Sequence, residues 1–179
     1  MRIIAGTRKG HTIAAPKGLG TRPTGDRVRE AAFNLIGPVD EAAVLDLFAG
    51  SGAMGLEALS RGARRCVFVE SDRGACRAIE ANLAKLRLTG ALVLCQDALL
   101  ALRQERTAHR SYELVLCDPP YDLWATLEPS LGEPLGAVLA DGGLLLVETD
   151  SHTEPELPPF SKRTSRRYGS ARISIFEHP

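Results

Sequence analysis

The tetrapeptide Asp118-Pro119-Pro120-Tyr121 holds the residues of this chain that are best suited to chemistry. It directly follows the apolar run 114–117, which is typical of a buried parallel strand, and open α/β sheets bind ligands at the carboxyl ends of such strands. Two consecutive prolines lack N–H donors and stiffen the turn, which leaves the Asp118 carboxylate and the Pro119 carbonyl as fixed acceptors. With the Tyr121 ring beside them, these acceptors predict a site for a planar amino group, such as the exocyclic amine of a nucleobase. The simpler alternative is a proline-rich turn that only ends a strand.

A glycine-rich loop between a predicted strand and a predicted helix is the second motif. Its sequence, Gly50-Ser51-Gly52-Ala53-Met54-Gly55, matches the pattern GxGxxG, in which glycines let the backbone approach a ligand closely. Glu70 ends the next apolar run, twenty residues beyond Gly50, where a carboxylate can accept hydrogen bonds from ribose hydroxyls. Alone, this pattern fits a dinucleotide as well as S-adenosylmethionine.

Asp46 favours S-adenosylmethionine. It lies near the end of an otherwise apolar strand, where a buried carboxylate needs a partner, and a cationic amino acid moiety would be one. Asp97 follows the next strand but one and is expected to border the adenine. Each residue has a simpler explanation, Asp46 as a helix-capping acid and Asp97 as the N-cap of the next helix. Together with Glu70 and Asp118, however, they follow successive strands, which predicts one shared site.

The elements that position these residues alternate between strands and helices. Strands are expected at 44–48, 66–69, 91–94, 112–117 and 143–147. Helices are expected at 26–36, from the glycine loop to about Arg61, at 72–87, and at 123–139 with interruptions at Pro129 and Pro134. Two antiparallel strands near 162–168 and 171–177 complete a Rossmann-like α/β fold, with a mostly parallel seven-stranded sheet, a C-terminal hairpin and helices on both faces.

Length and composition bound the class of protein. The chain has 179 residues, 44% apolar and 25% charged, which predicts a single soluble domain over 1–179, with residues 1–24 as a basic N-terminal hairpin arm. No stretch of about 18 apolar residues and no signal-like start occur, so we expect a cytoplasmic protein without membrane contact. The four cysteines and four histidines are scattered and suggest neither a disulfide framework nor a metal site.

Charge is unevenly distributed although the net charge is zero. Residues 1–30 carry seven basic and two acidic side chains, residues 31–160 carry ten and nineteen, and residues 161–179 carry five and one. Basic ends around an acidic middle fit a phosphate-binding rim beside a ligand pocket, and equally an ordinary solvated surface. The candidate phosphate contacts are Arg2, Arg8, Lys9, Arg163, Arg166 and Arg167.

On these motifs the chain resembles the bacterial RsmD family of class I S-adenosylmethionine-dependent methyltransferases, which methylate the N2 amine of a guanine in 16S ribosomal RNA. The resemblance runs nearly end to end and is most specific in two blocks, Arg22–Asn34 and Asp46–Ala63. It is also carried by Met1–Gly6, Phe68–Glu70, Asp118–Tyr121 and Tyr168-Gly169. Departures are small: Gly25 replaces a threonine of the family, and the tail after Gly169 lacks an acid and a threonine.

The resemblance implies a role for each matched residue. Asp46 and the backbone of Ala49, Gly50, Ser51 and Gly52 would hold the methionine part of the cofactor. Glu70 would hold the ribose, and Asp97 with Ala98 the adenine, while Thr24, Asp26 and Arg27 would close the pocket. Asp118 and Pro119 would orient the amine of a flipped-out guanine, on which Tyr121 stacks. The expected partner is 16S ribosomal RNA or the small ribosomal subunit, and the expected state is a monomer.

Other functions stay open at this point. A DNA adenine-N6 methyltransferase uses the same kind of tetrapeptide, although this chain has no room for a separate target-recognition domain. A protein-glutamine methyltransferase would be expected to carry Asn in place of Asp118. A non-catalytic RNA-binding assembly factor and a nicotinamide oxidoreductase are the alternatives from other classes.

Overall fold

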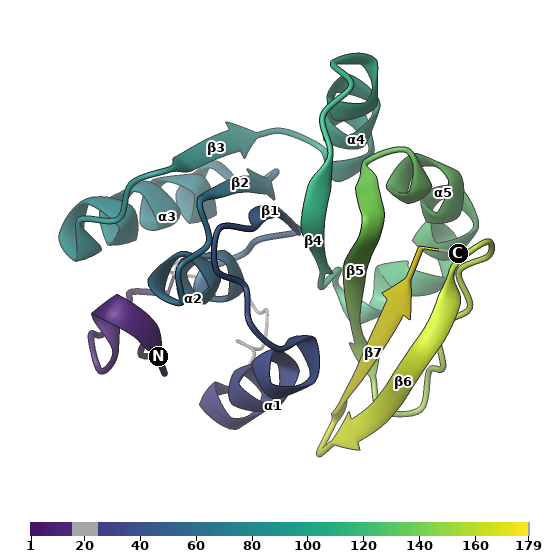
Figure 1. The fold of residues 1–179 in the computed structure, drawn as a ribbon. Helices are drawn as coiled ribbons and strands as arrows, with labels where there is room; N and C mark the ends of the chain where they lie inside the picture. The colour runs from purple at the N-terminus through teal and green to yellow at the C-terminus, as the bar shows by residue number, and fades with distance from the viewer. Residues whose placement is uncertain (16–24, 179) are drawn as a thin grey trace.

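A computed structural model describes residues 1–15 and 25–178, and in this part of the chain seven strands form one sheet (Figure 1). The sheet has the order β3-β2-β1-β4-β5-β7-β6. Strands β1 to β5 run parallel to one another, whereas β7 runs antiparallel to both β5 and β6. The predicted Rossmann-like sheet with an antiparallel C-terminal hairpin is therefore confirmed. The strands are β1 (Ala43–Leu47), β2 (Arg65–Glu70), β3 (Ala91–Cys95), β4 (Tyr112–Cys117), β5 (Leu139–Asp150), β6 (Ser161–Tyr168) and β7 (Ala171–Glu177).

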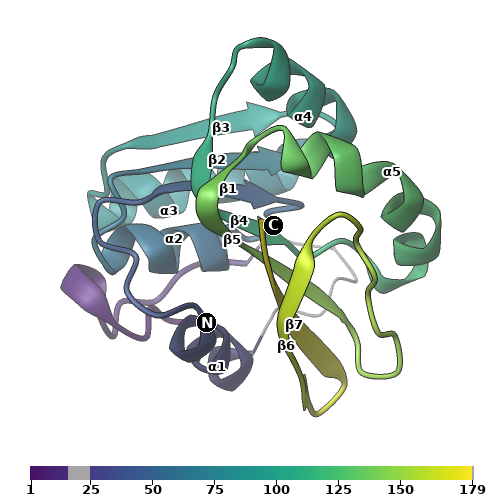
Figure 2. The same cartoon turned by 45° about the vertical axis from the view of Figure 1, so that its right-hand side comes forward.

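Helices cover both faces of the sheet, as Figures 1 and 2 show. Three pack on one face: α1 (Asp26–Ile36), α2 (Ala53–Ser60) and α3 (Arg73–Leu86). Two pack on the other: α4 (Ala98–Thr107) and α5 (Trp124–Gly136). Because side chains alternate along a strand, Val44 of β1 enters the first core and Leu45 the second. Within the described residues, none of the helices has the length and apolar character needed to cross a bilayer.

The structure corrects the sequence prediction at three elements. Helix α5 continues through Pro129 and Pro134 instead of being interrupted. A proline inside a helix costs about 3 kcal/mol, and the burial of Leu131 and Leu135 against the sheet offsets that cost. Helix α4 was predicted only through the alternative explanation of Asp97 as an N-cap, without bounds, and β5 extends beyond the predicted 143–147 at both ends.

The N-terminal residues 1–15 dock on α2 and α3 through the backbone (Figure 1). The buried Glu57 carboxylate of α2 accepts hydrogen bonds from the N–H groups of Ile4 (2.8 Å) and Ala5 (2.9 Å). Asn82 of α3 exchanges two hydrogen bonds of 2.9 Å with the backbone of Ala14. A single antiparallel bridge joins Arg2 and Thr12. The remainder of the predicted arm, 16–24, lies outside the described residues.

Candidate active site at the carboxyl ends of the parallel strands

Acidic residues follow one another across the carboxyl ends of the parallel strands. One row of paired residues crosses four strands just before this edge: Val69, Leu47, Cys117 and Val147. On three of those strands the next residue is acidic: Glu70, Asp118 and Glu148. Paired positions of neighbouring strands project to the same face of the sheet, and side chains alternate between the faces along each strand. Asp46 directly precedes Leu47, so it projects to the same face as the residues that directly follow Val69, Cys117 and Val147. The four carboxylates therefore belong to the sheet face that α1, α2 and α3 cover, at the edge to which the strands in Figure 2 point.

Asp46 is buried, with 3% of its surface exposed. Its Oδ2 accepts a hydrogen bond of 2.9 Å from the N–H of Gly55 in the first turn of α2, so the capping explanation holds. Burial nevertheless raises the pKa of this carboxyl to about 7, and the charge of Glu70 adds to the effect. The Gly55 bond lowers the pKa but does not offset desolvation. A cation placed against Asp46 would stabilise its ionised form.

Glu70 fixes the glycine-rich loop. Its Oε2 accepts a hydrogen bond from the N–H of Gly50 and its Oε1 one from the N–H of Asp72, both of 2.8 Å. Gly50 and Gly52 have positive φ angles of 54° and 75°, which favour glycine, so the loop turns sharply from β1 into α2. A carboxylate offers about four acceptor positions, and these bonds use two. Glu70 therefore keeps the capacity to accept hydrogen bonds from a vicinal diol.

Asp97 is the N-cap of α4, which confirms the simpler of the two explanations given for this residue. Its Oδ1 accepts a hydrogen bond of 2.9 Å from the N–H of Leu100, and its side chain is exposed. Ala98, the first residue of α4, is buried. Both follow β3 at the same sheet edge as Glu70, and their contact with adenine stays a prediction.

The tetrapeptide turns away from β4 into a short 3-10 helix, Tyr121–Leu123. Pro119 is buried and Asp118 is half-buried, whereas the Tyr121 side chain is 36% exposed. The Tyr121 hydroxyl donates a hydrogen bond of 3.0 Å to Oε1 of Glu148, which is 5% exposed. Glu148 is not among the site residues predicted from the sequence. The rule that selected Asp118 applies to it as well, because Glu148 is the acidic residue directly after the apolar run 144–147.

Of the residues expected to close the pocket, Asp26 and Arg27 lie in the first turn of α1. Asp26 begins α1 and forms ion pairs with Arg29 (2.9 Å) and with Arg2 of the N-terminal arm (3.4 Å). Its carboxylate therefore ties α1 to the arm, and Arg27 beside it is exposed. Thr24 lies outside the described residues. The cofactor contacts of this group stay predictions.

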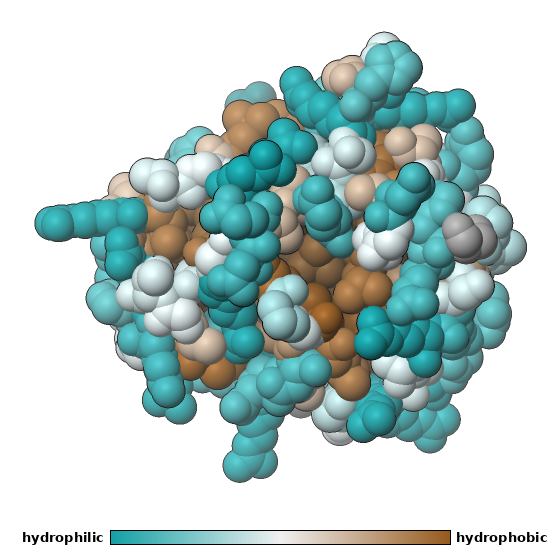
Figure 3. Space-filling view, in the orientation of Figure 1, coloured by the Kyte–Doolittle hydropathy of each residue, from teal (hydrophilic) through white to brown (hydrophobic). Residues whose placement is uncertain are grey.

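The predicted phosphate contacts divide into structural and exposed side chains. The Arg8 guanidinium donates to the carbonyls of Leu86 and Arg87 and so caps the carboxyl end of α3. Arg163 forms an ion pair of 3.2 Å with Glu177. Arg166 and Arg167 are exposed on β6, the edge strand of the sheet, and Lys9 is exposed on the arm. Figure 3 shows such hydrophilic side chains framing an apolar central area on one face of the molecule.

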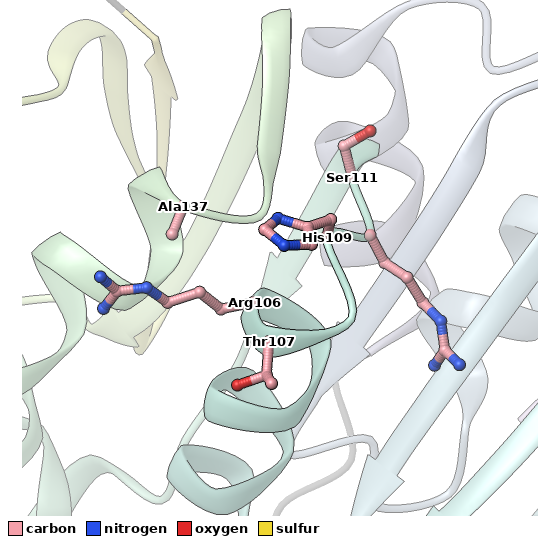
Figure 4. Close-up of a pocket in the computed structure, with 6 residues that line it drawn as sticks. Arg106, Thr107, His109, Ser111 and Ala137 are labelled. Carbon is pink, nitrogen blue, oxygen red and sulfur yellow. The ribbon is translucent and has the colours of Figure 1, made fainter.

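A separate hollow lies at the opposite end of the sheet (Figure 4). It is lined by residues that precede β4 and by Ala137, which precedes β5. Two of its arginines are already paired, Arg106 with Glu133 and Arg110 with Glu105. None of the predicted site residues lines this hollow, so it is distinct from the candidate site.

Comparison with known proteins adds an independent finding. Residues 1–177 match the model of the family described as "Conserved hypothetical protein 95". The chain is 40% identical to "Ribosomal RNA small subunit methyltransferase D" of Escherichia coli (strain K12) over 163 residues, 88% of this chain and 78% of that protein. It is 38% identical to "Putative rRNA methyltransferase YlbH" of Bacillus subtilis (strain 168) over 186 residues, 99% of this chain and 98% of that protein. The solved structure of "Putative methyltransferase yhhF from Escherichia coli" matches with a TM-score of 0.84 and 35% identity, covering 99% of this chain and 97% of that one.

Proposed function

The chain belongs to the RsmD family, and from that premise we propose that it methylates the N2 amine of a guanine in 16S ribosomal RNA with S-adenosylmethionine as the methyl donor. One observation carries the proposal. The tetrapeptide Asp118–Tyr121 and the carboxylates of Asp46 and Glu70 share one edge and one face of the parallel sheet. A site for a planar amine therefore adjoins a site for a cationic, ribose-bearing ligand.

The residues present fit the cofactor. When bound, S-adenosylmethionine supplies a methyl group that its sulfonium already activates. The buried Asp46 would face the cationic methionine part, and the Gly50–Gly52 backbone, tied to Glu70, would let that part approach closely. Glu70 would accept the ribose hydroxyls, and Asp97 with Ala98 would border the adenine.

Asp118 and Pro119 would orient the nucleophile. The lone pair of the guanine amine is delocalised into the ring, which makes this nitrogen a poor nucleophile. If the Asp118 carboxylate and the Pro119 carbonyl each accept one amino hydrogen, the nitrogen is held with its lone pair toward the methyl group. The amine nitrogen would accept the methyl group that the sulfonium supplies, and Asp118 or water would then accept the amino proton that the product loses. Such orientation can lower a barrier by roughly 7–11 kcal/mol in favourable cases.

Tyr121 would hold the base by stacking. Base–aromatic stacking contributes about 1–3 kcal/mol. Withdrawing a guanine from its own stack costs a few kcal/mol, so stacking on an exposed ring offsets part of that cost. Arg166 and Arg167 are exposed on the edge strand, and their contacts with RNA phosphates would contribute further binding free energy. These contacts suit 16S RNA or the small subunit as the partner of a monomeric enzyme.

A transfer assay tests the proposal against its rivals. The protein is incubated with labelled S-adenosylmethionine and either unmodified small ribosomal subunits or duplex DNA. Label in RNA guanine supports the proposal, whereas label in DNA adenine supports the adenine-N6 alternative. If calorimetry detects no binding of S-adenosylmethionine, the non-catalytic RNA-binding alternative is favoured, and binding of NADH in its place supports an oxidoreductase.

A further inference from the structure

The hydrogen bond between Tyr121 and Glu148 joins the proposed stacking ring to the body of the sheet. Glu148 lies near the carboxyl end of β5, is paired with Ile173 of β7 and has only 5% of its surface exposed. A buried carboxylate needs hydrogen-bond partners, and the Tyr121 hydroxyl is one, at 3.0 Å. Tyr121 itself is 36% exposed. Its polar end is therefore anchored in the protein, while part of its side chain stays open to a ligand.

This anchor acts on a segment with little secondary structure of its own. The 3-10 helix that Tyr121 begins has three residues, and its backbone bonds include one from the Leu123 N–H to the Pro120 carbonyl (2.9 Å) and one from the Trp124 N–H to the Tyr121 carbonyl. Pro119 and Pro120 fix the chain before the ring, and Glu148 fixes its far end. A tyrosine held at both ends keeps one rotamer, whereas an exposed aromatic side chain held only at its backbone can change rotamers.

We propose that Glu148 is a positioning residue for methyl transfer, which sets the plane of the Tyr121 ring relative to Asp118. The inference rests on the proposed function. The register of β4 and β5 makes Glu148 and Asp118 neighbours, one residue beyond the pair Cys117 and Val147. A base stacked on Tyr121 then has its amine at the Asp118 carboxylate only while the ring keeps this orientation. Glu148 thus acts through Tyr121 and does not itself contact the reacting atoms.

The chain offers a matched control at the other end of the same strand. The Tyr112 hydroxyl at the start of β4 donates to the Glu105 carboxylate of α4, and both residues are almost fully buried. This pair has the same chemistry as Tyr121 and Glu148, but lies at the amino end of the strand, away from the candidate site. Tyr112→Phe therefore reports what losing a tyrosine–glutamate hydrogen bond does to stability alone.

The test compares kcat and KM for unmodified small subunits among Tyr121→Phe, Glu148→Leu, Glu148→Gln and the double variant Tyr121→Phe/Glu148→Leu. Tyr121→Phe keeps the ring and removes the donor, and we expect kcat to fall about tenfold or more, as for a hydrogen bond to a charged group. Glu148→Leu should cause a similar loss. The double variant should lose little more than either single variant, because both remove the same bond. Glu148→Gln keeps an acceptor oxygen and should recover most of kcat.

Two results would overturn the inference. One is a kcat for Tyr121→Phe equal to that of Tyr112→Phe and the wild type. The other is a double variant whose loss is the product of the two single losses. Thermal unfolding identifies any variant that fails to fold, and Tyr121→Phe, at a partly exposed position, keeps the test valid if Glu148→Leu is unstable. A wild type that methylates no guanine would instead contradict the proposed function, and the inference with it.

Discussion

Asp46 accepts a hydrogen bond of 2.9 Å from the backbone N–H of Gly55, which joins the end of β1 to the first turn of α2. The carboxyl keeps a pKa of about 7 because its burial disfavours the charge more than this one bond favours it. At neutral pH, Asp46 is therefore poised between its neutral and ionised forms. A cationic ligand placed beside Asp46 would stabilise its ionised form.

The pH dependence of cofactor binding follows from this pKa. A protonated Asp46 cannot pair with the cationic methionine part, so binding requires the loss of one proton below pH 7. The dissociation constant for S-adenosylmethionine should rise about tenfold for each pH unit between pH 7 and 5. Calorimetry over this range measures it. In the Asp46→Asn variant the dependence should disappear, and a wild-type affinity that is constant from pH 5 to 7 would contradict the assignment.

The contributions of Asp46 and Glu70 to binding should be distinguishable with two ligands that share only part of their structure. 5′-Methylthioadenosine carries the adenine and ribose of the cofactor but not its amino acid. Asp46→Asn should weaken binding of S-adenosylmethionine at least tenfold and leave binding of 5′-methylthioadenosine nearly unchanged. Glu70→Gln should weaken binding of both ligands, because it would disturb the proposed ribose contact and the bonds to Gly50 and Asp72. Calorimetric titration of each variant with each ligand gives the answer. Equal effects of Asp46→Asn on both ligands would disprove this division of the site.

Gly55 should be required for the packing of α2. A Cβ atom at this position would lie 2.7 Å from Cys66 Sγ and closer still to the Phe68 ring, inside a packed core. Gly55→Ala should therefore lower the free energy of unfolding in urea by about 1–3 kcal/mol, despite the higher helix propensity of alanine. Gly136→Ala is the matched control, since its Cβ would meet Phe160 at an ordinary 3.8 Å. Equal stability of the two variants would show that α2 can shift without cost.

Exposed and structural arginines should differ in their effects on RNA binding. Replacing Arg166 and Arg167 by alanine should weaken binding to 16S RNA and reduce its salt dependence, because fewer counterions are released. The melting temperature of this double variant should stay close to that of the wild type. Arg8→Ala should instead lower the melting temperature, because Arg8 caps α3. Filter binding over a salt series, with thermal unfolding alongside, distinguishes the two classes. An unchanged salt slope for the double variant would remove β6 from the RNA interface.

Much of the fold was predictable because the central strands are continuous apolar runs bounded by turn residues. The extent of α4 was not predicted because its first five residues are all apolar and its last five all polar, so that its sequence shows no helical periodicity. The prolines of α5 were misjudged because local propensity counts their cost but not the packing of Leu131 and Leu135 against the sheet. Local sequence does not report such tertiary compensation.

The site was predictable where its residues follow strands directly. Asp46, Glu70 and Asp118 were found because an acidic residue at the end of an apolar run is conspicuous in sequence. Glu148 follows the apolar run 144–147 in the same way, but its role depends on contact with Tyr121, 27 residues earlier in the chain, which the sequence does not report. The structural role of Arg8 was equally invisible, since its partners at the end of α3 lie 78 and 79 residues away.

The most direct test is the identity of the methylated nucleoside in 16S RNA. Unmodified small subunits are incubated with S-adenosylmethionine and either the wild type or Asp118→Ala, and the RNA is digested and analysed by mass spectrometry. Calorimetry confirms that the variant still binds the cofactor. We predict N2-methylguanosine with the wild type and none with the variant. Methylation of adenine, no methylation by the wild type, or an undiminished signal with Asp118→Ala would contradict the account.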